Sequence, residues 1–101
     1  MGEAMRRASR IDATQKEIAE VLKAFGCQIL YLHQVGGGCP DLLVLAHSIE
    51  RGETDGSWDM FLVECKARTG KLRAAQQKLI DAGWPIVVLR SAEEAEQWLR
   101  G

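Results

Sequence analysis

Three short apolar runs of strand-like composition follow one another between residues 27 and 65, and they constrain the fold more than any other feature. They span Cys27–His33, Asp41–Ala46 and Met60–Cys65. The pattern then changes to a helical apolar spacing near Ala74–Ala82, followed by another apolar run over Ile86–Leu89. A helix between two strands is typical of a parallel crossover, so the last strand is expected to lie parallel to the third run. The chain is thus predicted to form a mixed β-sheet.

Helices are expected on both sides of this sheet. A first helix is predicted near Thr14–Phe25, where apolar residues recur at helical spacing and Gly26 ends the pattern. Ser91 and Glu94 have the spacing of a capping box and begin a terminal helix. Four residues form its predicted inward face: Ala92, Ala95, Trp98 and Leu99. The crossover helix has a predicted apolar face of its own: Leu72, Ala75, Leu79 and Ala82.

The resulting order is αβββαβα, an α/β fold with a mixed central β-sheet flanked by helices. We assign residues 1–11 to a basic N-terminal arm and residues 12–101 to a single domain. A chain of 101 residues with 47% apolar composition has enough core for one such domain. The polar stretch from His47 to Trp58 reads as a hairpin loop.

Composition excludes several classes of protein. The net charge is −1, and no apolar run approaches the roughly 18 residues that a membrane span requires. The three cysteines, Cys27, Cys39 and Cys65, lack CxxC spacing, which argues against a disulfide framework or a zinc ribbon. We therefore expect a cytoplasmic protein with reduced thiols, no membrane association and no organic cofactor.

Positive charge is concentrated in one segment of this nearly neutral chain. Its members are Lys66, Arg68, Lys71, Arg73 and Lys78, and the residues before it are predominantly acidic. A basic segment beside an acidic one suits a protein that contacts phosphates in one place and holds metal ions in another. The alternative is an ordinary solvated helix face.

Two carboxylates are expected to meet at the ends of neighbouring strands. Asp41 begins the second run and Glu64 lies near the end of the third, so an antiparallel hairpin makes them neighbours. Opposed carboxylates repel, and a divalent cation relieves the repulsion. Lys66 lies two residues after Glu64, hence on the same face of the strand, where its ammonium group can orient water or neutralise transition-state charge. An exposed pair on a solvated sheet face is the alternative for Glu64 and Lys66.

These motifs, in this order, resemble the PD-(D/E)XK nuclease superfamily, and within it the compact VRR-NUC branch of phage-type, Holliday-junction-resolvase-like proteins. The resemblance extends from Asp12 to about Glu94. The matching segments are Gly36-Gly37-Gly38, Pro40-Asp41-Leu42-Leu43, Val63-Glu64-Cys65-Lys66, Gly70-Lys71-Leu72, Gln76, and Val87-Val88-Leu89-Arg90-Ser91 with Glu94. The resemblance implies a restriction-endonuclease-like αβββαβ core, here with an added C-terminal helix. One departure is the start of the crossover helix, Leu72-Arg73-Ala74-Ala75, where family members usually have Ser or Thr and Pro.

Carried over to this sequence, the resemblance implies a magnesium or manganese site. Asp41 and Glu64 become metal ligands, with the Cys65 backbone carbonyl as a further ligand, and Lys66 becomes the catalytic lysine. Glu17 resembles the first-helix glutamate that faces the metal in these enzymes; Asp12 is the alternative for that role, or caps the helix. Cys65 itself points to the opposite face and fits as a core thiol.

The implied activity is a metal-dependent DNA endonuclease, structure-selective for branched DNA or a Holliday junction, acting as a homodimer. Gln76 resembles the helix glutamine that supports the metal site or contacts the phosphate. The full set of expected nucleic-acid-binding residues is Lys71, Arg73, Gln76, Arg68, Gly37, Arg6, Arg7 and Arg10. Binding to the backbone would be salt-dependent and weakly sequence-specific.

Other readings of the sequence remain open. The nuclease-like fold could serve as a catalytically inactive module that binds nucleic acid or a phage or host partner protein. A phage assembly module without any nucleic-acid binding is a third class. His33 and His47 lack ligand spacing and are expected to be surface or strand-end histidines. The glycine run could cradle a phosphate or serve as a flexible turn.

Overall fold

A computed structural model describes residues 13–47 and 58–101 of the chain. Within these ranges the elements follow the predicted order: helix α2 (Ala13–Ala24), strands β1 (Gln28–Tyr31), β2 (Leu42–His47) and β3 (Trp58–Cys65), helix α3 (Ala74–Asp81), strand β4 (Ile86–Leu89) and helix α4 (Ala92–Arg100). The predicted basic arm and most of the hairpin loop lie outside the described residues, as do Arg6, Arg7, Arg10 and Asp12.

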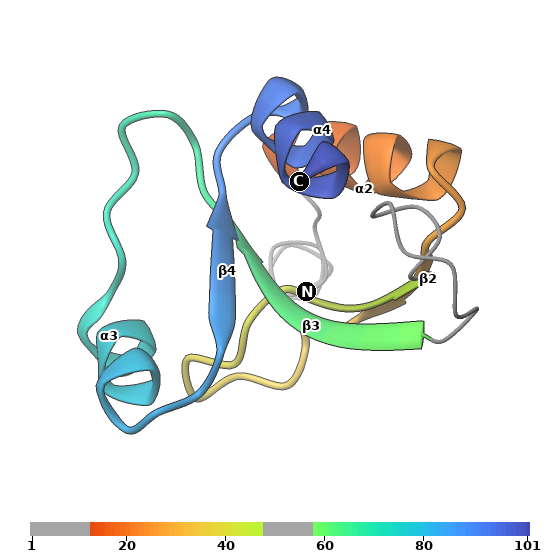
Figure 1. The fold of residues 1–101 in the computed structure, drawn as a ribbon. Helices are drawn as coiled ribbons and strands as arrows, with labels where there is room; N and C mark the ends of the chain where they lie inside the picture. Colours follow the sequence, from red (N-terminus) through yellow and green to blue (C-terminus); the bar gives the residue numbers. More distant parts are fainter. Residues whose placement is uncertain (1–12, 48–57) are drawn as a thin grey trace, which may run out of the picture.

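The described strands form one mixed sheet in the order β1-β2-β3-β4 (Figure 1). β1 and β3 both pair with β2 in antiparallel fashion, and β4 pairs with β3 in parallel. The parallel pairing confirms the crossover predicted from the change of periodicity after Cys65. β1 is shorter than its predicted run, whereas the hairpin strands extend to His47 and Trp58, which face each other across the sheet.

The hydrophobic core lies between one face of the sheet and helices α2 and α4, which run together along that face (Figure 1). β2 and β3 contribute alternate residues, because the side chains of a strand point to opposite faces. The fully buried large side chains are Ile18, Leu22, Leu42, Leu99, Val44 and Val63. Trp98 packs edge-on against Phe61, with 4.8 Å between the ring centroids. The inward face predicted for the terminal helix is confirmed by buried Ala95 and Leu99.

Helix α4 begins as its capping residues predict. The Ser91 hydroxyl accepts a hydrogen bond from the Glu94 backbone N–H at 3.0 Å. The Glu94 carboxylate accepts one from the backbone N–H of Arg90, one residue before the position that a standard capping box uses. The first turn of the helix is therefore fixed by its own side chains.

The predicted apolar face of α3 is wrong. Ala75 and Ala82 are exposed, Leu79 is half-buried, and the one fully buried residue of the helix is Gln76. The reason is the sheet position that the helix meets: α3 lies on the side away from α2 and α4 (Figure 1) and reaches the sheet at a carboxylate. The helix therefore buries the polar residue Gln76 against the sheet, at a position where helical periodicity predicts an apolar residue.

In the described part of the chain, no helix is long and apolar enough to cross a membrane.

Candidate active site

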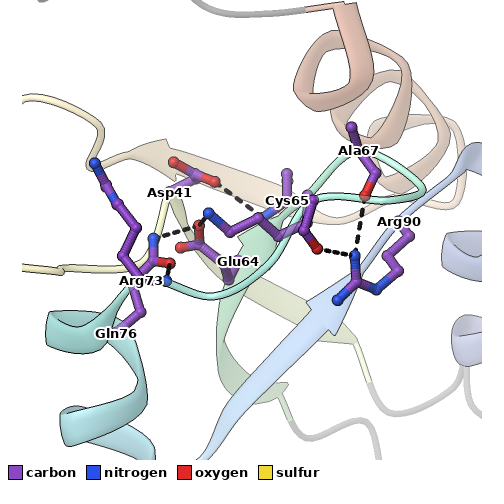
Figure 2. A network of polar contacts seen from close by, with 9 residues as sticks. Asp41, Glu64, Cys65, Ala67, Arg73, Gln76 and Arg90 are labelled. Carbon is purple, nitrogen blue, oxygen red and sulfur yellow. Dashed lines mark hydrogen bonds and ion pairs between the residues drawn. The ribbon is translucent and has the colours of Figure 1, made fainter.

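The register of β2 and β3 brings Asp41 and Glu64 together, as the hairpin prediction requires. Leu42 pairs with Val63, so the residue before β2 faces the residue after Val63 across the hairpin. Asp41, Glu64 and Lys66 share the face of the sheet opposite to the α2 and α4 layer, since Val63 and Cys65 point into the core. Figure 2 shows the two carboxylates side by side where the strands meet.

Asp41 is tied to the end of β3 by its side chain. Its Oδ2 atom accepts a hydrogen bond from the backbone N–H of Cys65 at 2.9 Å. The backbone carbonyl of the same residue accepts a bond from the Leu32 N–H at 2.7 Å, which holds the chain beside the end of β1. Both contacts fix the aspartate on the sheet frame, a requirement for any precisely placed ligand or catalytic group.

Cys65 therefore joins the site through its backbone. Its side chain is 5% exposed and belongs to the hydrophobic core, which confirms the predicted core thiol. The predicted role of its carbonyl as a metal ligand stays a prediction.

Glu64 is a buried carboxylate, with 3% of its surface exposed. Its Oε2 atom accepts a hydrogen bond from Gln76 Nε2 at 2.7 Å and lies 3.6 Å from Lys66 Nζ (Figure 2). Its Oε1 atom is also buried but has no hydrogen-bond partner among the described residues. Leaving a buried charged oxygen without a partner costs free energy, on the order of a few kcal/mol. This oxygen is therefore a candidate to contact a bound cation.

The electrostatics of Glu64 follow from this placement. The pKa of its carboxyl group is raised to about 7, first by burial and then by the negative charge of Asp41, whereas Lys66 and the hydrogen bond from Gln76 lower it. Burial and the charges of both carboxylates also raise the pKa of the Cys39 thiol. Negative charge is thus crowded at this point of the fold, with one ammonium group to offset it.

Gln76 connects helix α3 to the carboxylate pair. Its Oε1 atom accepts a hydrogen bond from the Arg73 backbone N–H at 2.8 Å, while its Nε2 atom donates to Glu64. A neutral amide can satisfy a backbone donor and a carboxylate at once, which neither Glu nor Leu can do. The side chain is only 4% exposed. Of the two roles expected for Gln76, the contacts correspond to support of the site.

The segment between Lys66 and α3 is held by Arg90, which follows β4. Its Nη1 atom donates to the carbonyl oxygens of Ala67 at 3.0 Å and Gly70 at 2.6 Å (Figure 2). The guanidinium group thereby closes the loop that carries Arg68 and Lys71. In the sequence resemblance Arg90 belongs only to a strand motif, and nothing in the spacing indicates this contact.

The other predicted residues are not all gathered at the carboxylate pair. Glu17 is exposed on α2, and no hydrogen bond or ion pair joins it to a described residue. Lys71 and Arg73 are exposed between β3 and α3, and Arg68 lies with Arg90 and Thr14 along a separate hollow near the start of α4. The basic segment therefore borders the carboxylates on one side and reaches α4 on the other.

The donor set fits a hard divalent cation bound by few protein ligands. Mg²⁺ takes oxygen ligands and commonly uses one or two carboxylates while keeping water molecules and substrate phosphate oxygens. The orphaned Oε1 atom of Glu64, with Asp41 beside it, offers that arrangement. No group of three His, Cys, Asp or Glu side chains within residues 13–47 and 58–101 is arranged to hold a metal ion.

No protein-family model, no curated protein and no solved structure matches this chain. Its function is therefore inferred from its own residues.

Proposed function

We propose that this chain is a metal-dependent endodeoxyribonuclease of the PD-(D/E)XK type, with a restriction-endonuclease-like core of the VRR-NUC kind. The observation that carries the proposal is the buried Glu64 carboxylate, which has one oxygen bonded to Gln76 and the other without a partner, beside Asp41 and Lys66. A structural carboxylate would have both oxygens satisfied. An oxygen held ready for a cation is what a metal-dependent hydrolase requires.

Each residue has a defined task in this proposal. Asp41 and Glu64 would hold the cation, with the carbonyl of Cys65 and the Glu17 carboxylate as further ligands. When bound, Mg²⁺ or Mn²⁺ offsets charge on the scissile phosphate and acidifies a water molecule. Lys66 would orient an attacking water by hydrogen bonding and take or give a proton at Nζ, or neutralise developing negative charge. Gln76 keeps Glu64 in place throughout.

The exposed basic residues between β3 and α3 bind the DNA backbone. Lys71 and Arg73 are exposed between β3 and α3, Arg68 is exposed along the hollow near the start of α4, and Gly37 lies in the turn before Asp41. Arg6, Arg7 and Arg10, which lie outside the described residues, are proposed as further phosphate contacts. Such contacts position a duplex without reading its sequence, so selectivity rests on the structure of the DNA, and branched DNA is the proposed substrate.

A homodimer is the proposed assembly, and the outer face of the sheet supports it. Leu30 is 62% and Met60 69% exposed, and Leu43 and Leu45 lie between them on the same face. The solvated face of a sheet is normally polar, whereas this part of the outer face carries four apolar side chains. Such an apolar patch suits an identical patch related by a two-fold axis. Analytical ultracentrifugation should show a dimer that Met60→Lys disrupts and Gln97→Lys, on exposed α4, leaves intact.

The activity is tested by cleavage. Labelled four-way junction, flap, duplex and single-stranded DNA are incubated with Mg²⁺, Mn²⁺ or EDTA, using the wild type, Lys66→Ala and the control Lys23→Ala. We expect metal-dependent cutting that Lys66→Ala lowers by about a hundredfold or more, with an unchanged circular dichroism spectrum. The absence of cutting on every substrate, with equal DNA binding by all three proteins, would instead identify a catalytically inactive binding module.

A further inference from the structure

A cleft opens beside the carboxylate pair, between the glycine turn that precedes β2 and the start of α3. Its volume is about 350 Å³. The lining residues are His33, Gly36, Gly37, Gly38, Cys39, Asp41, Arg73 and Ala75. The lining thus combines a carboxylate, a guanidinium group, an imidazole and glycine backbone.

The glycine turn is built against α3 and admits no side chain at the contact. Gly36, Gly37 and Gly38 all have positive φ angles, of 82°, 66° and 82°. A Cβ atom on Gly38 would lie 2.8 Å from the backbone carbon of Ala75, whereas positions 36 and 37 face open space. The wall of the cleft is therefore bare main chain, which permits a close approach by a ligand.

His33 supplies a second polar atom without a partner. Its Nδ1 atom is buried and makes no hydrogen bond with a described residue. The imidazole lies edge-on to the Tyr31 ring, with 6.5 Å between the ring centroids. A buried imidazole nitrogen without a partner is costly unless a ligand completes it. An imidazole N–H can donate a hydrogen bond to an oxygen atom of an anion.

We propose that His33 and Arg73 form an anion-binding subsite that holds a phosphodiester group of the substrate next to the carboxylate pair. This proposal rests on the proposed nuclease function and assigns the phosphate contact to a histidine outside every matched motif. The imidazole N–H and the guanidinium group donate to the non-bridging oxygens, and the bare glycine turn leaves room for the sugar-phosphate chain. Asp41 and the subsite line the same cleft. One DNA phosphate can therefore contact both the subsite and a cation held by Asp41.

The test measures DNA binding in EDTA, where neither cutting nor metal binding contributes. His33→Phe keeps the ring and its contact with Tyr31 but removes both nitrogens, and Arg73→Gln removes one charge. The matched controls are His47→Phe, at the far end of β2, and Arg100→Gln, on exposed α4. Binding of a fluorescent DNA duplex is measured by anisotropy over a range of salt concentrations, and unfolding by urea checks each fold.

We expect both subsite variants to weaken DNA binding by about tenfold or more, and Arg73→Gln also to lower the salt slope by about one. The controls should bind like the wild type. His33→Phe should be as stable as the wild type or more so, because the Nδ1 atom that it removes has no partner among the described residues.

Wild-type affinity in both subsite variants would overturn the proposal. A loss of Mn²⁺ affinity in His33→Phe, measured calorimetrically, would also overturn it, since His33 would then be a metal ligand. DNA binding that depends on His33 in a protein that cuts nothing would refute the nuclease and leave the subsite standing.

Discussion

The buried Glu64 carboxylate makes the stability of the fold depend on pH. Its pKa is raised from 4.5 to about 7 in the folded chain, chiefly by burial. Below pH 4.5 the group is protonated in both the folded and the unfolded state, so it has no effect on stability. Between pH 4.5 and pH 7 the group loses its proton in the unfolded state but keeps it in the folded state. The folded state therefore becomes less favourable as the pH rises. Above pH 7 the loss is complete.

The size of this effect follows from the shift. Each pKa unit corresponds to about 1.4 kcal/mol, so the shift of Glu64 lowers the free energy of unfolding by at most about 3 kcal/mol between pH 4.5 and pH 8. Glu64→Gln keeps the shape and an oxygen for Gln76 but cannot ionise. The wild type should therefore lose about 3 kcal/mol more than Glu64→Gln over this range.

Urea unfolding in EDTA at a series of pH values measures both proteins. The two proteins are compared by the slope of the free energy of unfolding against pH. An amide at position 64 brings a polar group without a partner, which changes the stability by the same amount at every pH and leaves this slope unaffected. Adding Mn²⁺ at pH 8 should restore stability to the wild type and not to Glu64→Gln, because ligand binding to the folded state favours it. Parallel profiles for the two proteins would refute the assignment of a raised pKa to Glu64.

Three other changes test the frame around the site. Gly38→Ala should destabilise the fold by about 3 kcal/mol, because it adds a backbone clash to a positive φ, whereas Gly36→Ala should cost about 1 kcal/mol from the φ angle alone; thermal unfolding distinguishes them. Gln76→Ala removes hydrogen bonds to a backbone N–H and to Glu64 and should cost about 2 to 3 kcal/mol in urea unfolding. Arg90→Ala should speed hydrogen exchange of the Gly70 amide while the core amides stay protected, since the guanidinium group closes that loop.

The carboxylate pair could be predicted because its position depends on local rules. Alternation along a strand and antiparallel pairing at a hairpin place Asp41 opposite Glu64 without reference to any other part of the chain. The same rules place Lys66 on the face of Glu64 and Cys65 on the other. The order of the elements was predictable for a similar reason. The spacing of apolar residues that distinguishes a helix from a strand can be read within each segment alone.

The contacts of α3 could not be predicted in this way. Helical periodicity identifies the apolar side of a helix, and for α3 that side is Ala75, Leu79 and Ala82. The helix instead buries Gln76, because the sheet presents a carboxylate where the helix meets it. Which face a short helix buries depends on a residue of the sheet twelve positions earlier in the chain, and periodicity carries no information about such a partner.

His33 illustrates the same limit in the proposed anion-binding subsite. A histidine after a strand carries no spacing signal, because its neighbours in the cleft come from the glycine turn and from the start of α3. The turn approaches the helix closely enough to exclude a Cβ atom at Gly38, and this contact encloses the space that His33 lines. The three glycines are the sequence signal for that enclosure. A run of glycines directly before a strand-end carboxylate indicates that main chain packs beside the site. The residues just before such a turn, here His33, are then candidates for contact with a ligand.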